Sequence, residues 1–413
     1  MSGDSRPRLR YFENSPNQRH IGAEDRYLYA RTAARRRLGI IGTGTIGQEH
    51  MRVAALLGRM RVHGVFDPAA ASVAAALEGF RRHADYQPRR YASLDEAIDD
   101  PDTEALFVCT PNHTHIALVE VAARSGKALF VEKPMATTVA HAKRIAEIAA
   151  GYAGFIQVGL QYRYKAPYVE ARHEVLERRS LGAVRMLTMS EYRPPFLDKV
   201  GQWNKFARYS GGTLIEKCCH YFDLLNLFAG ARPARVFASG GQAVNFKDFE
   251  YRGRRADIDD HALVIVEYAG GVRASFTLNM FAPHFHEELV VSGERGRLLA
   301  SERFDVHRDE VARSRLVVET GETGAARTTT LAYADDIDKS GHHGATFFEH
   351  RAFADRLDGL ATDAATPLQG LWSILVAAAA EASRASGAPI DIGEFITAHD
   401  LTDLIDPGEQ TPP

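Results

Sequence analysis

Residues 38–47 read LGIIGTGTIG, a short apolar run followed by the glycine pattern G-x-G-x-x-G. Asp67 stands 20 positions after Gly47, at the end of a second apolar run. A strand, this glycine turn, a helix and a later acidic residue together form the dinucleotide-binding fingerprint. In it, Gly42 permits the tight turn, Gly44 lets the backbone approach the pyrophosphate, and Gly47 lets helix and strand pack closely. The stretch therefore predicts a Rossmann domain.

The start of the following helix, at Thr45 and Ile46, is expected to supply N–H groups and a positive dipole to the phosphates. Asp67 is expected to accept hydrogen bonds from the adenine-side ribose, and its carboxylate would repel a 2′-phosphate. Pro68 follows it rather than a basic residue. The sequence thus favours NAD over NADP as the cofactor. The alternative is a glycine turn that holds no ligand.

Strand and helix patterns alternate through the first half of the chain. Short apolar runs predict strands at residues 38–42, 61–66, 105–109, 128–131 and 155–159. Between them, helices are expected at residues 46–57, 69–80, 115–125 and 136–150. Alternation at this spacing is typical of a doubly wound parallel sheet.

The pattern changes after Gly159. Long β-type runs occupy residues 184–192, 234–240, 261–268, 272–280, 288–292 and 314–319. One helix is expected among them at residues 212–228, and two more at 347–357 and 368–386. These runs predict an α+β domain with a large, mostly antiparallel open sheet. The expected division is an arm at 1–37, a Rossmann domain at 38–159, a second domain at 160–395 and a tail at 396–413.

Composition limits the classes of protein that fit. The 413 residues are 45% hydrophobic and 25% charged, as in an average soluble globular protein. The net charge of −3 does not suggest a nucleic-acid partner, and no run of 18 apolar residues could span a membrane. The three cysteines, Cys109, Cys218 and Cys219, are too few for a disulfide framework and suit a reducing cytoplasm.

The first 37 residues are basic, with nine arginines against four acidic residues. Their net charge is +5, so the rest of the chain carries −8. The segment could be a solvated arm or could cross to a neighbouring subunit.

Two polar segments directly follow predicted strands, where ligands bind in such sheets. One runs from Thr110 through Pro111 and Asn112 to His115, and the other is Glu132-Lys133-Pro134. The first could be an ordinary turn and helix cap, and Lys133 could be a solvated surface lysine.

These motifs and a downstream segment, GGTLIEKCCHYFD at residues 211–223, resemble the glucose-fructose oxidoreductase, inositol dehydrogenase and MocA family. The resemblance spans nearly everything from residue 38 to about 387. It implies NAD chemistry, with Lys133 as the proton-transfer residue and a peptide bond before Pro134 that is often cis. Thr110, Pro111, Asn112, His115 and Glu132 are then expected along the cofactor.

Other site residues are implied less directly. The segment from Gln161 to Tyr164 resembles the family's inter-domain segment, whose arginine approaches the nicotinamide; here that residue is Arg163. We expect Tyr162 and Trp203 to contact the substrate, although a tryptophan more often packs than binds. The resemblance also implies a homo-oligomer, a dimer or a tetramer, that forms by face-to-face packing of the large sheet.

Glu216, His220 and Asp223 are spaced i, i+4 and i+7, which on one helix places them on one face. Oxidation of a carbinol requires loss of the hydroxyl proton, which a histidine or a lysine of lowered pKa can accept. In the family, the histidine matching His220 works with the lysine, and the position of Glu216 is usually Asp. A buried core histidine is the alternative. The Cys218-Cys219-His220 run lacks zinc-ligand spacing, so no metal is expected.

The sequence thus predicts an NAD-dependent dehydrogenase that oxidises a secondary hydroxyl of a sugar, glycoside or cyclitol, with Lys133 and His220 in a proton relay. Glu216 is the third expected catalytic residue. One alternative is a redox-neutral enzyme that recycles its NAD, as in glycoside cleavage or epimerisation. Another is a non-catalytic regulator that senses NAD or a sugar.

Overall fold

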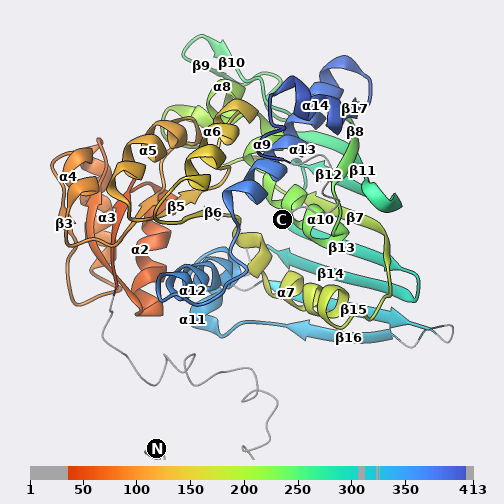
Figure 1. Cartoon of the computed structure of the whole chain (residues 1–413), viewed down its shortest axis with the longest axis horizontal. Helices are drawn as coiled ribbons and strands as arrows, with labels where there is room; N and C mark the ends of the chain where they lie inside the picture. The colour runs from red at the N-terminus through yellow and green to blue at the C-terminus, as the bar shows by residue number, and fades with distance from the viewer. Residues whose placement is uncertain (1–35, 306–311, 322–323, 325, 406–413) are drawn as a thin grey trace, which may run out of the picture.

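The computed structural model describes residues 36–305, 312–321, 324 and 326–405. Nearly all of the basic N-terminal arm, residues 1–35, and the end of the C-terminal tail, residues 406–413, lie outside this range. Figure 1 shows two sheets, one at each end of the molecule, with helices between them. Among the described residues, none of the helices has the length and apolar character needed to cross a membrane.

The first sheet is parallel and six-stranded, in the order β3-β2-β1-β4-β5-β6. Its strands are β1 Arg36–Ile41, β2 Met60–Phe66, β3 Arg89–Arg90, β4 Ala105–Val108, β5 Ala128–Glu132 and β6 Ile156–Gly159. In register, Leu38 of β1 lies beside Val62 of β2 and Ala105 of β4. This is the doubly wound sheet that the strand–helix alternation predicts.

Helices cover both faces of this sheet, as its apolar strands require. The helices are α2 Thr45–Leu57, α3 Ala70–Phe80, α4 Leu94–Asp99, α5 His115–Ala122 and α6 Val139–Ala150. Residues of α2 and α3 share a core with Phe107 and Phe130, whereas residues of α5 and α6 pack with Leu106 and Leu129 on the other face.

The second sheet has nine strands in the order β16-β15-β14-β13-β7-β12-β11-β8-β17. Its longer strands are β7 Val184–Tyr192, β8 Pro233–Gly241, β11 His261–Tyr268, β12 Arg273–Asn279, β13 Phe285–Gly293, β14 Gly296–Phe304, β15 Arg313–Thr320 and β16 Ala326–Leu331. Strand β17 is the short segment Ile390–Asp391. All pairs are antiparallel except β7 with β12. The large, mostly antiparallel sheet is therefore confirmed.

The hydrophobic pattern of the sequence did not predict strands β14 and β16, and the structure gives a physical reason for each. In β14 a charged residue, Glu302, occupies a buried position, so the hydrophobic alternation breaks. Strand β16 is an edge strand whose residues are almost all exposed, and it therefore carries no apolar face.

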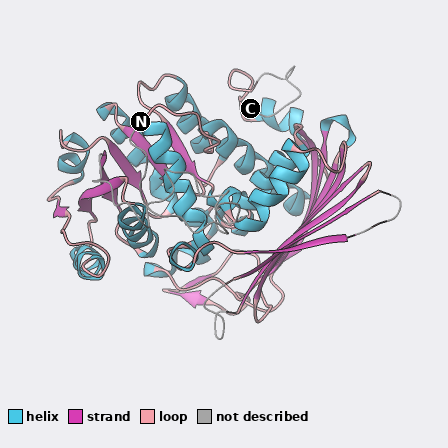
Figure 2. Ribbon diagram, turned by 90° about the horizontal axis from the view of Figure 1, so that it is seen from below, coloured by secondary structure: helices cyan, strands magenta, loops and turns pink. Residues whose placement is uncertain are grey.

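C-terminal helices join the two halves (Figure 1). They are α12 Ala345–Leu357, α13 Pro367–Ser386 and α14 Ile392–Ala398. Helix α12 packs on α2, and α13 packs between α6 and strand β8. Figure 2 shows the second sheet with helices on one face and open space on the other. Helix α14 continues past residue 395, where the tail was expected to begin, and Leu401 and Ile405 are buried beyond it.

The expected helix at 212–228 is divided into two. Helix α9 covers Thr213–Glu216 and helix α10 covers Cys219–Ala229. The backbone leaves regular helical geometry at Lys217, with φ −104°, and at Cys218, with ψ −6°. Glu216 and His220 therefore sit on different helices, and the one-face argument from their spacing does not hold.

Candidate active site

The glycine loop between β1 and α2 is shaped as the fingerprint requires. Gly42 has a φ of +94°, and a Cβ there would lie 2.6 Å from the carbonyl oxygen of Cys109. A Cβ on Gly47 would lie 2.0 Å from the carbonyl oxygen of Gly42. At Gly44, in contrast, no atom lies within 4 Å of a Cβ position. Two glycines are thus needed for packing, and the third leaves open space that a pyrophosphate fits.

The start of helix α2 is free to bind an anion. Gly44 is its N-cap without a side-chain hydrogen bond, and its first turn contains no acidic residue. The exposed Thr45 and half-buried Ile46 follow. Asp67 supports the loop, since its Oδ2 accepts a hydrogen bond from the Thr43 backbone N–H at 2.8 Å. The Thr43 hydroxyl also donates to Oδ2, at 3.3 Å, and the Ala69 backbone N–H donates to Oδ1, at 2.8 Å. Since a carboxylate oxygen can accept two bonds, Oδ1 retains capacity for a ribose hydroxyl.

His115 joins the two polar segments that follow β4 and β5. One ring nitrogen, Nε2, lies 2.9 Å from the carbonyl oxygen of Thr110, and Nδ1 lies 3.0 Å from that of Pro134. The side chain is fully buried, and burial lowers the pKa of His115. Thr110 also hydrogen-bonds Thr114 at 2.7 Å, and Asn112 donates to the carbonyl of Ser210 at 3.3 Å. These contacts fix the loop from Pro111 onward against both domains.

Glu132 is engaged in a buried chain of polar groups. Its Oε1 lies 2.7 Å from Nε2 of His50, and its Oε2 accepts from the backbone N–H of Lys133 at 3.0 Å. The other nitrogen of His50 lies 2.6 Å from Nε2 of His350. Burial opposes ionisation, but the hydrogen bond and charge of His50 outweigh it and lower the pKa of Glu132. Glu132 thereby ties helix α2, strand β5 and helix α12 together.

Lys133 lies beside Glu216. Its Nζ donates to the Glu216 carbonyl oxygen at 3.2 Å and lies 4.0 Å from Oε1 of the same residue. Burial disfavours the ammonium, but the negative groups around it, Glu216 first and then Cys219 and Glu132, together outweigh burial and raise the pKa of Lys133. The peptide bond to Pro134 is cis, as the resemblance implies. In the chain alone, Lys133 is therefore a cation rather than a base.

His220, in α10, has the opposite electrostatic character. Its ring stacks on Tyr162, with centroids 3.9 Å apart and planes 7° apart. Burial, with the positive charges of Lys133 and Lys217, lowers the pKa of His220 well below its usual range. Within the described part of the chain, its Nδ1 has no hydrogen-bond partner. His220 is thus a neutral imidazole with an unpaired Nδ1 among the described residues, close to a cationic lysine.

Arg163 and Asp223 are paired with each other. The Nε and Nη2 of Arg163 lie 2.6 and 2.5 Å from the two oxygens of Asp223. Arg163 Nη1 also donates to Oε1 of Gln369, in α13, at 2.9 Å. Both ionic partners are buried. The guanidinium that we expected along the cofactor is thus engaged with groups of the second half. Trp203, expected at the substrate, is half-buried in the 3-10 helix Val200–Lys205. Within the described residues, its side chain makes no hydrogen bond or ring contact with the other predicted site residues.

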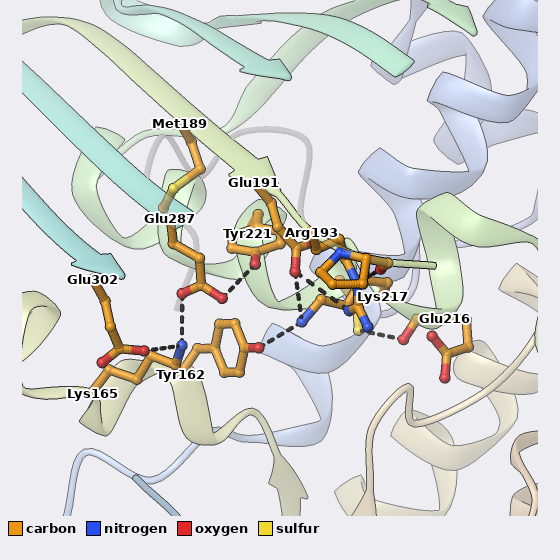
Figure 3. A network of polar contacts seen from close by, with 12 residues as sticks. Tyr162, Lys165, Met189, Glu191, Arg193, Glu216, Lys217, Tyr221, Glu287 and Glu302 are labelled. Atoms are coloured by element: carbon orange, nitrogen blue, oxygen red, sulfur yellow. Dashed lines mark hydrogen bonds and ion pairs between the residues drawn. The ribbon is translucent and has the colours of Figure 1, made fainter. Parts of the chain in front are cut away.

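The structure adds residues that sequence reasoning did not select. Lys217 Nζ donates to the hydroxyl of Tyr162 at 2.5 Å and lies 3.2 Å from Oε1 of Glu191 (Figure 3). Farther along the network, Lys165 Nζ lies 2.7 Å from carboxylate oxygens of both Glu287 and Glu302. One signal could have revealed these lysines. Only nine of the 50 basic residues are lysines, so each lysine in this chain is unusual.

Comparisons with known proteins identify relatives of both halves of the chain. Residues 36–160 match GFO_IDH_MocA, described as an oxidoreductase family with an NAD-binding Rossmann fold. Residues 173–392 match that family's C-terminal alpha/beta domain. Among curated relatives, the uncharacterized oxidoreductase YrbE of Bacillus subtilis is 24% identical over 86% of this chain and 96% of its own. Myo-inositol 2-dehydrogenase of Thermotoga maritima is 26% identical over 64% of this chain and 75% of its own.

A solved structure shares the fold. Levoglucosan dehydrogenase in complex with NADH and levoglucosan superposes with a TM-score of 0.71 at 18% identity. The match covers 86% of this chain and 99% of that one.

Proposed function

Because this chain belongs to the GFO/IDH/MocA family of NAD-binding oxidoreductases, we propose that it oxidises a secondary hydroxyl of a sugar, glycoside or cyclitol. Relatives are named for such substrates, among them the inositol 2-dehydrogenase of Rhizobium meliloti, 27% identical over 64% of this chain. The observation that carries the proposal is the pair of Lys133 and His220, one cationic and one neutral: Lys133 Nζ lies at Glu216, the last residue of α9, and His220 lies in the first turn of α10.

The residues that would hold the cofactor lie along the first sheet. The open backbone at Gly44 and the free start of α2 suit the pyrophosphate. Asp67 would accept hydrogen bonds from the ribose. Thr110, Pro111 and Asn112 lie on the loop after β4, and Lys133, directly after the carboxyl end of β5, would face the reacting end of the cofactor.

The proton chemistry follows from the two charge states. Bound NAD would accept hydride from the carbinol carbon. Lys133 Nζ, held cationic by Glu216, would donate a hydrogen bond to the substrate oxygen and stabilise negative charge that develops on it. His220 is neutral, and its Nδ1 has no hydrogen-bond partner among the described residues, so this nitrogen would accept the hydroxyl proton. Tyr162 would orient His220 through the ring stack.

The test is turnover on a panel of cyclitols, monosaccharides and glycosides with NAD, followed at the NADH absorbance. A dehydrogenase accumulates NADH in proportion to oxidised product. Product without net NADH would identify a redox-neutral reaction instead. Binding of a sugar without any product would point to a regulator.

We further propose that the chain forms a homo-oligomer through the open face of the second sheet. Apolar side chains protrude there from three strands: Met186 is 53% exposed, Phe237 39%, Leu263 59% and Ile265 48%. Phe237 and Ile265 are direct cross-strand neighbours. An apolar patch of this kind marks an interaction surface, and pairing of like faces gives closed symmetry. The three buried, free cysteine thiols suit the cytoplasm, where we place the enzyme.

A further inference from the structure

A turn with an unusual backbone precedes helix α12. It reads Gly-His-His-Gly at residues 341–344 and follows the short helix α11, Asp335–Asp338. His342 and His343 have φ values of +42° and +53°, in the left-handed region that few non-glycine residues adopt. Such strain persists only where the surrounding structure holds it, and it is concentrated at functional sites. Neither histidine has a part in the chemistry proposed above, and their contacts differ.

The turn is attached to helix α2, the helix whose start is expected to bind the pyrophosphate. A Cβ on Gly341 would lie 2.4 Å from Oε1 of Glu49, so a glycine lets the backbone approach this carboxylate. Farther along α2, Arg52 Nε donates to the carbonyl oxygen of Ser340 at 2.8 Å. The turn therefore has a fixed position beside the cofactor-binding half.

Glu49 orients the ring of His342. Its Oε1 lies 2.7 Å from Nδ1 of His342 and accepts a hydrogen bond from the Thr346 hydroxyl at 2.6 Å. Burial raises the pKa of Glu49, but the charge and hydrogen bond of His342, the hydrogen bond of Thr346 and the charge of His50 together lower it to about 2. An ionised carboxylate only accepts hydrogen bonds, so Nδ1 carries the hydrogen of this contact. A partner of this kind fixes both the tautomer and the direction of an imidazole.

The second nitrogen of His342 is available to a ligand. Among the residues that the structure describes, Nε2 has no hydrogen-bond partner, and the side chain is 31% exposed. The ring lies 6.4 Å from that of Tyr162, centroid to centroid, with 56° between the planes. The imidazole of His220 stacks on the same phenol ring, and His342 is among the charges that lower the pKa of His220. A molecule bound at His220 would therefore have His342 as a neighbour.

His343 packs elsewhere, although its backbone has the same conformation. Its ring lies 4.7 Å from that of Phe304, in strand β14, and its Nδ1 lies 3.8 Å from a carboxylate oxygen of Asp338. Within the described part of the chain, its ring makes no contact with Tyr162 or His220. The two histidines thus share their backbone strain and differ in their surroundings, which makes His343 a matched control.

We propose that His342 binds a second hydroxyl of the substrate through Nε2 while the reacting hydroxyl lies at Lys133 and His220. Glu49 acts through His342, as its positioning residue. This inference rests on the proposed function and deepens it, because it names a residue that would distinguish a polyol from a simple alcohol. A hydroxyl both donates and accepts, so it suits Nε2 whether the imidazole is neutral or charged. A site group that hydrogen-bonds a hydroxyl discriminates against an analogue that lacks it.

The first experiment removes one hydroxyl at a time from the substrate, with the intact enzyme and NAD. D-Glucose is compared with its monodeoxy forms and myo-inositol with the deoxyinositols, and turnover is followed at the NADH absorbance. Any other sugar or glycoside of the panel that gives NADH is compared with its own deoxy forms in the same way. In the parent enzyme, kcat/KM for at least one deoxy form that still reacts should lie about tenfold or more below that of the full polyol, corresponding to about 1.4 kcal/mol.

The second experiment repeats these pairs of substrates in His342→Asn. An asparagine tolerates the left-handed backbone, and its amide N–H can still donate to Glu49, so the variant loses mainly the reach of Nε2. We expect kcat/KM for the full polyol to fall about tenfold and that of the deoxy form to stay within about threefold, so that the ratio of the two approaches one. His343→Asn has the same backbone conformation and should keep the parental ratio.

Two changes at Glu49 test its positioning role. The contacts of His342 and Thr346 both go to Oε1, and Glu49→Gln retains this oxygen, so it should keep the ratio. Glu49→Ala removes the acceptor and should lower the ratio as His342→Asn does, and it is informative even where His342→Asn does not fold. A merely structural defect would lower kcat/KM for both members of a pair alike, and their ratio would not change.

The outcomes separate the two proposals. Turnover of polyols with ratios near one in the parent enzyme, or with ratios that His342→Asn leaves unchanged, overturns the role of His342 and leaves the dehydrogenase intact. A weaker NADH affinity of this variant, with unchanged ratios, assigns the imidazole to the cofactor and also overturns that role. Absence of turnover on every member of the panel overturns both proposals.

Discussion

The imidazole of His220 lies parallel to the phenol ring of Tyr162, with 3.9 Å between the ring centroids. Tyr162 belongs to the 3-10 helix Gln161–Tyr164 that follows the last strand of the first sheet, whereas His220 belongs to α10 of the second half. The stack therefore joins the cofactor-binding half to the helix that carries the proposed base. Lys217 fixes the far end of Tyr162 through its hydroxyl.

Loss of either proton-handling group should slow the chemical step. Lys133→Met removes the cation that stabilises the substrate oxygen, and His220→Ala removes the neutral acceptor. We expect each to lower kcat by roughly 10²–10⁴-fold. NADH affinity, measured by fluorescence titration, should stay within about threefold of the parent, since a mutation at a residue that acts only in the transition state lowers kcat alone. His141→Ala, an exposed histidine of α6, is the matched control. Normal turnover in both variants would remove them from the mechanism.

Asp67 should set the cofactor preference. Its carboxylate repels a 2′-phosphate, so the affinity for NADH should exceed that for NADPH. Asp67→Asn removes the charge and keeps one of the two acceptor oxygens, which can serve the backbone N–H of Thr43 or that of Ala69. The ratio of the NADPH to the NADH dissociation constant should then fall by about tenfold, or about 1.4 kcal/mol. Equal affinities in the parent enzyme would contradict the role given to Asp67.

The buried group of Lys165, Glu287 and Glu302 should make stability depend on pH. Burial raises the pKa of Glu287, but the charges of Lys165 and Lys217 and the hydrogen bonds from Lys165 and Tyr221 together outweigh burial and hold that pKa below its usual value of 4.5. Around that pH the unfolded state therefore binds more protons than the folded state, so stability rises with pH. The contribution of Glu287 is present above a pH of about 4.5 and is lost as the pH falls toward its lower folded pKa.

Denaturant unfolding at several pH values measures this effect. Glu287→Gln should lower the free energy of unfolding at pH 7 by about 3–5 kcal/mol, because it breaks a buried ion pair. In this variant the free energy of unfolding should also fall less steeply than in the parent as the pH is lowered from about 5 to 3. Glu288→Gln is the control on the same strand, at a half-buried position. An unchanged pH profile in Glu287→Gln would show that the group does not titrate with folding.

The oligomer should depend on the open face of the second sheet. Ile265→Glu places a charge in the centre of the apolar patch, beside Phe237. Light scattering coupled to gel filtration should show a shift toward smaller species. Val244→Glu is the control, since Val244 is also exposed, at 62%, but lies in the segment after β8. Retention of the parent mass in Ile265→Glu would place the interface elsewhere.

The local sequence determined the cofactor-binding half of this protein. The glycine loop, the alternation that builds the parallel sheet, and the polar segments after β4 and β5 are visible because they depend on neighbours in the chain. Turn conformation, strand burial and helix starts are encoded within a few residues. Lys133 could be singled out in the same way, since it directly follows strand β5.

Only the tertiary structure decided which partners the charged groups have. The pairs of Arg163 with Asp223 and of His50 with Glu132 join residues 60 and 82 positions apart, and no spacing pattern marks them. The break at Lys217 and Cys218 separates Glu216 from His220, although their spacing predicts one helix. Glu302 lies buried in β14 because Lys165 compensates its charge. The cost of burying a charge depends on groups that only folding brings together, and for this reason the sequence indicates the chemistry while the fold selects the residues that perform it.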